Sequence, residues 1–181
     1  LTKDTDLTYT GFFVINAATS GGTAYAIFSA RDRVGNRGTE IDAGASIQID
    51  TAGPAIHRLV IEPSSPIKND EQTPATVTAI VGFDEQVKAG TQPQLAYLLS
   101  GEGHQTISID QLSQLSTQSG DAQTWQAQFP LPMDAGLNEA ETFHFTYQGS
   151  DDLDNLGNRI MADNLFQVYQ GELPPLEPPQ G

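Results

Sequence analysis

Apolar and polar residues alternate along most of this chain with the two-residue period of β-strands, not with the 3.6-residue period of helices. A clear example is Thr124-Trp-Gln-Ala-Gln-Phe129, in which Trp125, Ala127 and Phe129 share one face. Residues 111–118 are polar and are expected to form a short helical turn or a loop. The alternation predicts strands over residues 8–15, 23–30, 45–50, 56–61, 75–83, 95–100, 104–109, 124–129, 141–148 and 165–169.

The strands predicted between residues 56 and 169 are seven in number, which is the count of an immunoglobulin-like sandwich. We therefore predict an all-β fold, an immunoglobulin-like antiparallel β-sandwich. Alternation also predicts which side chains point into its core. The residues expected to be buried are Val77, Val81, Trp125, Phe129, Phe143, Phe145 and Tyr147.

One pattern occurs twice, first at residues 25–36 and again at residues 143–158. Each copy is an alternating strand that ends in an Asp-rich turn closed by Gly-Asn, and each is followed by another apolar strand. Asp32, and either Asp151 or Asp154, are expected to accept backbone N–H groups in these turns. Gly35 and Gly157 are expected to supply a positive φ. Repetition at this scale indicates a tandem array of similar modules.

The repeat predicts where the modules begin and end. Residues 1–53 hold strands equivalent to the last three of the scheme, so they are expected to be the C-terminal part of a first module. Residues 54–170 are predicted to be a complete module that follows a Pro-containing linker. Residues 171–181 are a Pro-rich linker or tail of polyproline-II type. One larger domain remains the alternative, and the start at Leu1 suggests a piece of a longer protein.

The formal net charge of −15 repels nucleic-acid phosphates and anionic lipid. No nucleic-acid partner and no direct membrane insertion are therefore expected, and no apolar stretch is long enough to span a bilayer. Cysteine is absent, which excludes disulfides, thiolate metal sites and a Cys nucleophile. No Gly-x-Ser-x-Gly motif or paired histidines indicate catalysis, so no enzyme activity is expected.

Three segments resemble bacterial Ig-like domains: Ser29-Ala-Arg-Asp-Arg-Val-Gly-Asn36, Ile49-Asp-Thr-Ala-Gly-Pro54 and Val81-Gly-Phe-Asp-Glu-Gln-Val87. The resemblance covers residues 23–169. It implies a tandem module of a large bacterial surface or secreted protein, such as an adhesin, and hence an extracellular or cell-surface location. The implied partners are neighbouring Ig-like modules of the same chain. The sequence departs from the family in its second turn, which is longer and more acidic, and at Asp84, where Ser is common.

Some arrays of this family hold calcium between modules, and the sandwich topology predicts where such a site would form. The loops after the second and sixth strands lie at the same end as the N-terminus of the domain. Calcium takes six to eight oxygen ligands, and acidic side chains supply them. A possible Ca²⁺ site is therefore predicted from acidic residues at that end, with solvated loops as the alternative. Its candidate ligands are Asp50, Asp84, Glu85, Asp151, Asp152 and Asp154.

The leading functional hypothesis is a non-catalytic structural spacer in an adhesion-related surface or secreted protein. One alternative is a module that binds a surface glycan or a protein through loops at one end of the sandwich. Another is an accessory domain of a secreted polysaccharide-degrading enzyme. An exposed row of aromatic residues on one sheet would favour glycan binding, whereas an aromatic-poor surface would favour the spacer.

Overall fold

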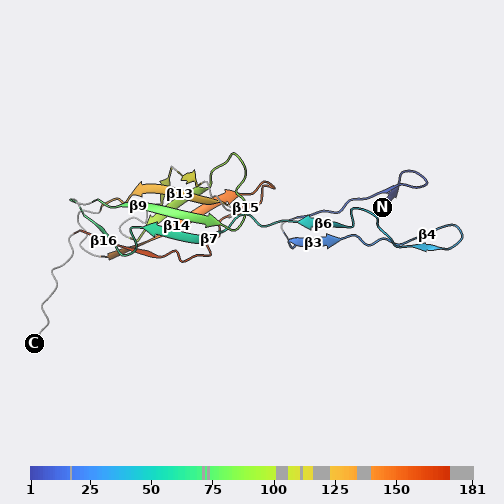
Figure 1. The fold of residues 1–181 in the computed structure, drawn as a ribbon, viewed down its shortest axis with the longest axis horizontal. Coiled ribbons are helices and arrows are strands. Elements are labelled where there is room, and N and C mark those ends of the chain that lie inside the picture. The colour runs from blue at the N-terminus through green and yellow to red at the C-terminus, as the bar shows by residue number, and fades with distance from the viewer. Residues whose placement is uncertain are drawn as a thin grey trace, which may run out of the picture. The chain divides into compact units, whose positions relative to one another are not determined.

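A computed structural model describes residues 1–16, 18–70, 72, 74–100, 106–110, 112–115, 123–133 and 140–171 of this chain. The chain divides into two compact units, Leu1–Ala52 and Gly53–Gly181. This division lies one residue before the boundary that the sequence suggested between residues 53 and 54. Every regular element of the described residues is a β-strand (Figure 1).

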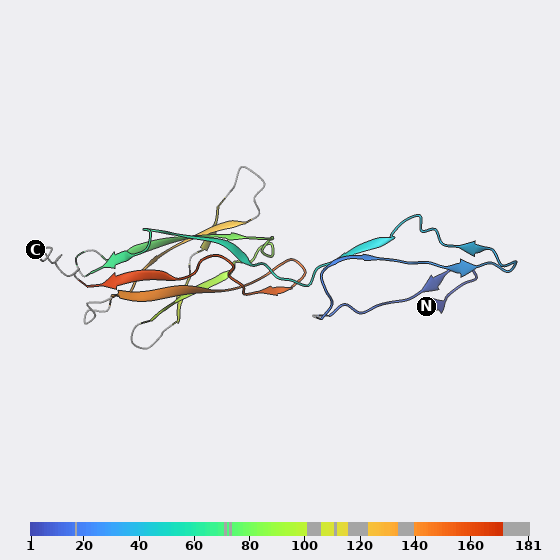
Figure 2. The same cartoon turned by 90° about the horizontal axis from the view of Figure 1, so that it is seen from below.

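The second unit is a sandwich of two sheets, whose layers are visible in Figure 2. One sheet has the strand order β12-β13-β9-β7, and the other has the order β11-β10-β14-β16-β8, with β15 paired to β14. The strands are β7 (Ile56–Glu62), β8 (Ile67–Asn69), β9 (Thr76–Phe83), β10 (Gln94–Leu99), β11 (Thr106–Ile109), β12 (Leu112–Gln114), β13 (Thr124–Pro130), β14 (Ala140–Ser150), β15 (Leu156–Gly157) and β16 (Phe166–Gln170).

The strand order is that of an immunoglobulin-like sandwich. Immunoglobulin strands A, B, E and D form one sheet, and strands C, F and G form the other. Here β7, β9, β13 and β12 take the places of A, B, E and D, while β10, β14 and β16 take those of C, F and G. The predicted fold class, an all-β immunoglobulin-like sandwich, is confirmed.

Two details of the prediction are wrong. The sandwich is not wholly antiparallel, because β8 runs parallel to β16 with Ile67 opposite Val168. The chain passes from β7 through Pro63 and Pro66, which cannot donate to a ladder, and continues in the opposite sheet. In addition, part of the polar segment expected to be a helical turn or loop forms β12, which pairs with β13.

The core of the second unit consists of aromatic and aliphatic side chains from both sheets. All seven residues that alternation placed inside are buried, with exposed fractions between 0% and 6%. Tyr97 stacks on Phe129 with ring centroids 4.8 Å apart, and Phe83 meets Tyr147 at 5.0 Å. Aromatic contacts between facing sheets stabilise the sandwich beyond the area that they bury.

The first unit consists of three two-stranded ladders, β1–β2, β3–β6 and β4–β5. These strands are β1 (Thr2–Lys3), β2 (Tyr9–Thr10), β3 (Gly22–Tyr25), β4 (Ala30–Arg31), β5 (Arg37–Gly38) and β6 (Ser46–Ile49). Both faces of the stretch from Tyr25 to Ala30 are fairly apolar, a pattern that predicts a central strand between two neighbouring strands. Among the described residues it has ladder partners on one side only, in β6 and β5.

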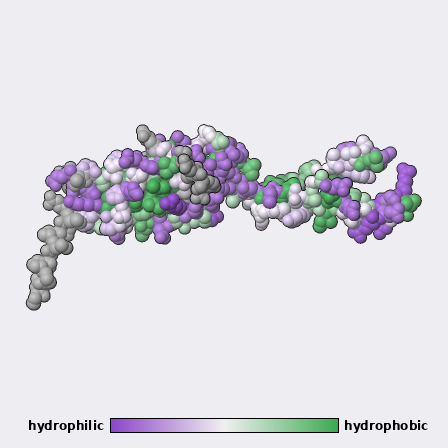
Figure 3. Space-filling model, viewed as in Figure 1, coloured by the Kyte–Doolittle hydropathy of each residue, from purple (hydrophilic) through white to green (hydrophobic). Residues whose placement is uncertain are grey.

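No described residue of the first unit is buried. Apolar residues instead gather on its surface, as Figure 3 shows, and the exposed fractions reach 95% for Leu7, 94% for Phe12 and 96% for Ile27. A two-stranded hairpin is at best marginally stable alone in water, and burial of apolar surface is the main favourable term in folding. The first unit therefore contains ladders without a core.

Candidate functional site: the acidic turn

The turn between β14 and β15 is organised by one carboxylate. Oδ1 of Asp151 accepts hydrogen bonds from the N–H groups of Leu153 at 2.8 Å and Asn155 at 2.9 Å. Its Oδ2 accepts a third bond, at 2.8 Å, from the side-chain amide of Asn155. Asp154 adopts a positive φ of 65°, which Asp tolerates better than most residues. Asp151 is 5% exposed and holds the turn closed from within.

The first unit contains the same turn. Oδ1 of Asp32 accepts from the N–H groups of Val34 at 3.0 Å and Asn36 at 2.8 Å, and its Oδ2 accepts from the Asn36 amide at 2.8 Å. These hydrogen bonds, led by the one from the Asn36 side chain, hold the pKa of Asp32 below its ordinary value, because they stabilise the ionised form. Gly35 has a φ of 94° and occupies the place of Asp154. The expected roles of Asp32, Asp151 and Gly35 are therefore confirmed.

The role expected for Gly157 was wrong. The repeated turn corresponds to residues 151–155 and has the same length as residues 32–36, so the second turn is not longer, contrary to what the sequence suggested. Its residue with positive φ is Asp154, and Gly157 is not among the glycines with positive φ. Gly157 is needed instead for close packing of two backbones. A Cβ atom added there would lie 2.0 Å from the carbonyl oxygen of Pro54, and one added at Gly53 would lie 2.3 Å from the carbonyl carbon of Leu156. The alternation of apolar and polar residues gives no sign of this contact. The glycines at positions 53 and 157 are compatible with a close approach of the two backbones, but they do not predict it.

The loop after β9 lies at the same end of the sandwich. Oδ1 of Asp84 accepts a hydrogen bond from the Ala55 N–H at 2.7 Å, which fastens the segment leading into β7. A carboxylate oxygen of Glu85 lies within 4.8 Å of one from Asp151. Burial, together with the charges of Asp84 and Glu85, raises the pKa of the Tyr147 hydroxyl, which donates to the Pro54 carbonyl at 3.0 Å.

The other two acids of the turn contact the loop between β9 and β10. Oδ1 of Asp152 accepts from the Ala89 N–H at 2.9 Å, and the Asp154 carboxylate pairs with the Lys88 ammonium group. The hydrogen bond that Lys88 donates to Asp154, followed by the negative charge of Asp154, raises the pKa of Lys88. The structure thus brings the two acidic loops of the second unit together, as the topology predicted.

The sixth candidate, Asp50, belongs to the first unit, where its Oδ1 accepts from the Ala52 N–H at 3.1 Å. Four of the candidates in the second unit, Asp84, Asp151, Asp152 and Asp154, also accept hydrogen bonds or pair with protein groups. Calcium favours shells of six to eight oxygens. An ion at this end would have to share these carboxylates with their present donors, so the calcium site stays a prediction.

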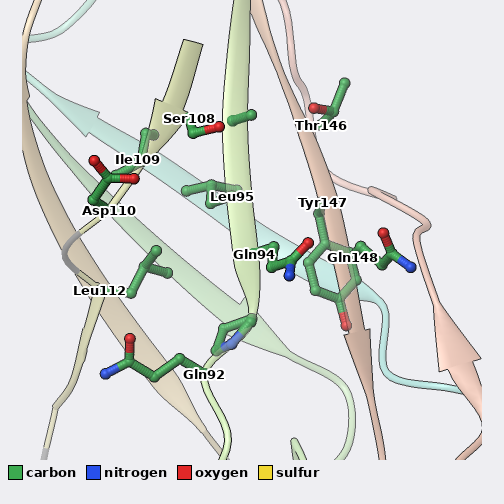
Figure 4. Close-up of a pocket in the computed structure, with 12 residues that line it drawn as sticks. Gln92, Gln94, Leu95, Ser108, Ile109, Asp110, Leu112, Thr146, Tyr147 and Gln148 are labelled. Atoms are coloured by element: carbon green, nitrogen blue, oxygen red, sulfur yellow. The ribbon is translucent and has the colours of Figure 1, made fainter. Parts of the chain in front are cut away.

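A hollow of about 600 Å³ lies beside β10, β11 and β14 (Figure 4). Its polar lining includes Gln92, Gln94, Asp110 and Gln148. Among the described residues that line it, Tyr147 alone is aromatic; its side chain is buried and its hydroxyl is bonded to the backbone. The described lining of the hollow therefore presents no exposed ring on which a sugar could stack.

No protein-family model matches the chain, and no curated protein matches it significantly. The resemblance to bacterial Ig-like domains accordingly rests on the segments quoted above, and the structure adds the sandwich fold. In the part of the chain that the structure describes, no helix is long and apolar enough to cross a bilayer.

Proposed function

We propose that this chain is a non-catalytic structural module that acts as a spacer in a bacterial cell-surface or secreted multidomain protein. Its partners are neighbouring modules of the same polypeptide, and adhesion is the process to which such a protein would belong. The observation that carries the proposal is the path of the chain through the second unit, which begins at one end of the sandwich and leaves at the other.

The beginning of the second unit is fastened at the end where the acidic turn lies. Gly53 packs on the backbone of residues 155–157, and Tyr147, near the end of β14, bonds to Pro54. The last strand, β16, ends beside the beginning of β14, where Tyr169 lies opposite Ala140. At about 3.4 Å per residue, the 11 residues of β14 separate these two ends by roughly 35 Å.

The end at which the chain leaves is held by a buried polar network. The side-chain amide of Asn69 donates to Oε1 of Gln170 at 3.0 Å, and the amide of Gln170 donates to Glu141 at 2.8 Å. The N–H of Gly171 donates to the Asn69 carbonyl at 2.9 Å. Asn69, Glu141 and Gln170 are all buried, and satisfied buried networks are stiff and costly to break.

The pairing of β8 with β16 suits a module that carries tension. A pull on the two ends of the second unit draws β8 and β16 in opposite directions along their length, because the two strands are parallel. Their ladder hydrogen bonds are then loaded together rather than one after another. The first and last parts of the sandwich are thus joined by a pair of strands loaded in shear.

The surface of the second unit favours the spacer over the glycan-binding alternative. Every aromatic residue from Phe83 to Tyr169 is buried or partly buried, and the exposed large hydrophobic residues of this unit are aliphatic. Sugar recognition commonly requires an accessible ring, and the described surface of this unit offers none. The alternative of an accessory domain receives no separate support from the site.

Single-molecule force spectroscopy tests the proposal on the whole chain held at its two termini. We expect the second unit to unfold in one step, and Ile67→Pro to lower the unfolding force because proline removes an N–H of β8 on the side that faces β16. Ile67→Ala is the matched control, since it removes the same side chain and keeps the N–H. Equal forces for the two variants would contradict the proposal, as would specific binding of a soluble glycan in a glycan-array screen.

A further inference from the structure

β7 is an edge strand of the four-stranded sheet, and the pairing of its neighbour shows which of its main-chain groups are open. β9 pairs with β7 on one side and with β13 on the other. The Phe83 N–H donates to the Gln123 carbonyl at 3.2 Å, on the β13 side. Successive residues of an antiparallel strand direct their main-chain groups to alternate sides. The odd-numbered residues of β9 therefore bond to β13, and the even-numbered residues bond to β7.

On β7, the residues opposite these even-numbered positions are Arg58, Val60 and Glu62. The N–H and C=O groups of Leu59 and Ile61 therefore point away from the sheet, although both side chains are buried in the core. Among the described residues, no strand pairs with β7 on that side along residues 58–62. An open edge of this kind is a template for a further strand.

The open stretch has a defined beginning and end. At its beginning the edge is covered, because Ile56 forms a parallel bridge with Ile160 and its N–H donates to the Arg159 carbonyl at 2.9 Å. At its end Glu62 is followed by Pro63, which has no N–H to donate to a ladder. A strand that docks on this edge can therefore pair only with residues 58–62.

The outward side chains of this stretch form a self-complementary pattern. Arg58, Val60 and Glu62 are all exposed, and the two charges stand at equal distances along the strand on either side of Val60. Among the described residues, neither charge has an ion-pair partner. When two such strands pair antiparallel about Val60, each Arg58 lies opposite Glu62 of the other copy. Opposite charges directly across a ladder stabilise the pairing.

We propose that β7 is a self-association edge, at which two copies of this chain pair antiparallel about Val60. Leu59 of one copy exchanges main-chain hydrogen bonds with Ile61 of the other, through the groups that β9 leaves open. The two four-stranded sheets then form one continuous sheet across a two-fold axis. A two-fold contact uses the same surface of both copies, which is the commonest arrangement in protein dimers.

Charge selects this register over others. A parallel pairing about Val60 sets Arg58 against Arg58 and Glu62 against Glu62, and an antiparallel pairing centred on either charge also opposes like charges. The outer edge of the other sheet is unsuitable for self-pairing. Its strand β8 covers only Ile67–Asn69, with Lys68 at the centre, so a second β8 would bring two ammonium groups together.

The contact area predicts a weak dimer. At about 3.4 Å per residue, residues 58–62 span roughly 17 Å along an edge that is about 10 Å thick. The contact is thus far smaller than the roughly 1,000 Å² that a stable interface buries. We expect reversible pairing, which becomes effective when many copies are held side by side.

A single introduced cysteine tests the geometry, because the chain contains no cysteine. Val60 and its copy would occupy a non-hydrogen-bonded position, where Cα atoms lie about 4.5 Å apart, within the range of a disulfide. Gln128→Cys is the matched control. Gln128 is exposed on the same face of the same sheet, but on β13, where the two copies would be about 24 Å apart. Under mild oxidation, we expect Val60→Cys to form a disulfide-linked dimer at least about tenfold faster than Gln128→Cys.

Charge reversal in the Val60→Cys chain tests the register. Arg58→Glu or Glu62→Arg alone sets like charges opposite each other and should slow the cross-linking by about tenfold. A mixture of these two variants restores both opposite-charge pairs between unlike copies, so its rate should return to that of Val60→Cys. Urea unfolding followed by Trp125 fluorescence shows whether each variant is folded.

The inference is overturned if Val60→Cys and Gln128→Cys cross-link at equal rates, or if charge reversal leaves the rate unchanged. It is also overturned if the mixed variants cross-link as slowly as either one alone. Association through another surface of the chain would give one of these results. The unfolding force of a single molecule does not depend on this pairing, so the spacer function is tested separately.

Discussion

Replacing Gly157 by Ala is a direct test of how the second unit is fastened at its beginning. The added methyl group would lie 2.0 Å from the carbonyl oxygen of Pro54 and 2.8 Å from both Gly53 C and Pro54 N. These neighbours are backbone atoms, so a side-chain rotation cannot relieve the contact. The segment that leads into β7 has to move away from β15.

The magnitude follows from the contacts that this movement disturbs. Overpacking a tight site costs about 1–3 kcal/mol, and each displaced hydrogen bond costs about 1 kcal/mol more. The bonds at risk include those from the Ile56 N–H to the Arg159 carbonyl, at 2.9 Å, and from Tyr147 to Pro54. At a strand position without such a clash, Gly→Ala raises the free energy of unfolding by roughly 0.5–1 kcal/mol, which offsets part of this loss. We expect the free energy of unfolding to fall by about 2–3 kcal/mol.

Urea unfolding followed by Trp125 fluorescence measures this change, because the single tryptophan lies in the core of the second unit. A midpoint lower by roughly 1–2 M is expected at the usual dependence on urea. Gly38→Ala is the matched control from the repeat, since its added Cβ would meet only Phe28, at 3.9 Å. Midpoints for the two variants within about 0.3 M of each other would refute the close-packing argument.

Three further predictions follow from the core and the turns. Trp125→Ala should lower the free energy of unfolding by about 3–5 kcal/mol by circular dichroism, and a loss below about 1 kcal/mol would contradict its core position. The pKa of Asp32, followed by NMR, should lie below 3.8 and rise in Asn36→Ala. Because the pKa of Asp32 is lower in the folded turn, the ionised carboxylate stabilises the turn at pH values above its ordinary pKa. This stabilisation is lost as the pH falls through the lowered pKa. An unchanged pKa of Asp32 in Asn36→Ala would exclude the Asn36 hydrogen bond as the cause. About 5 mM Ca²⁺ should raise the melting temperature above the value in EDTA, and the double variant Asp50→Asn with Asp154→Asn should abolish the rise. Equal melting temperatures of the unchanged chain in Ca²⁺ and in EDTA would show that these acids are only hydrogen-bonding loop residues.

The sequence was sufficient for the features that depend on local pattern. Alternation placed Trp125 and Phe129 in the core, because successive side chains of a strand point to opposite faces. The repeated Asp-rich turns were also recognisable, because an Asp side chain that bonds to nearby N–H groups leaves a short motif in the chain. The acidic loops at one end of the sandwich followed from the topology once the fold class had been inferred.

Other features depended on contacts between segments that are distant in the chain. The parallel pairing of β8 with β16 and the backbone contact of Gly53 with Gly157 leave no periodic signal. Five of the six carboxylates proposed as calcium ligands, all except that of Glu85, are shown to accept N–H groups of the protein. For the acids of the second unit this depends on how the turn and the neighbouring loop are folded together. Alternation could predict the strands of the first unit, but burial requires an opposing sheet. Only the tertiary structure showed that its described residues have none, since a strand sequence records which face is apolar and not what covers it.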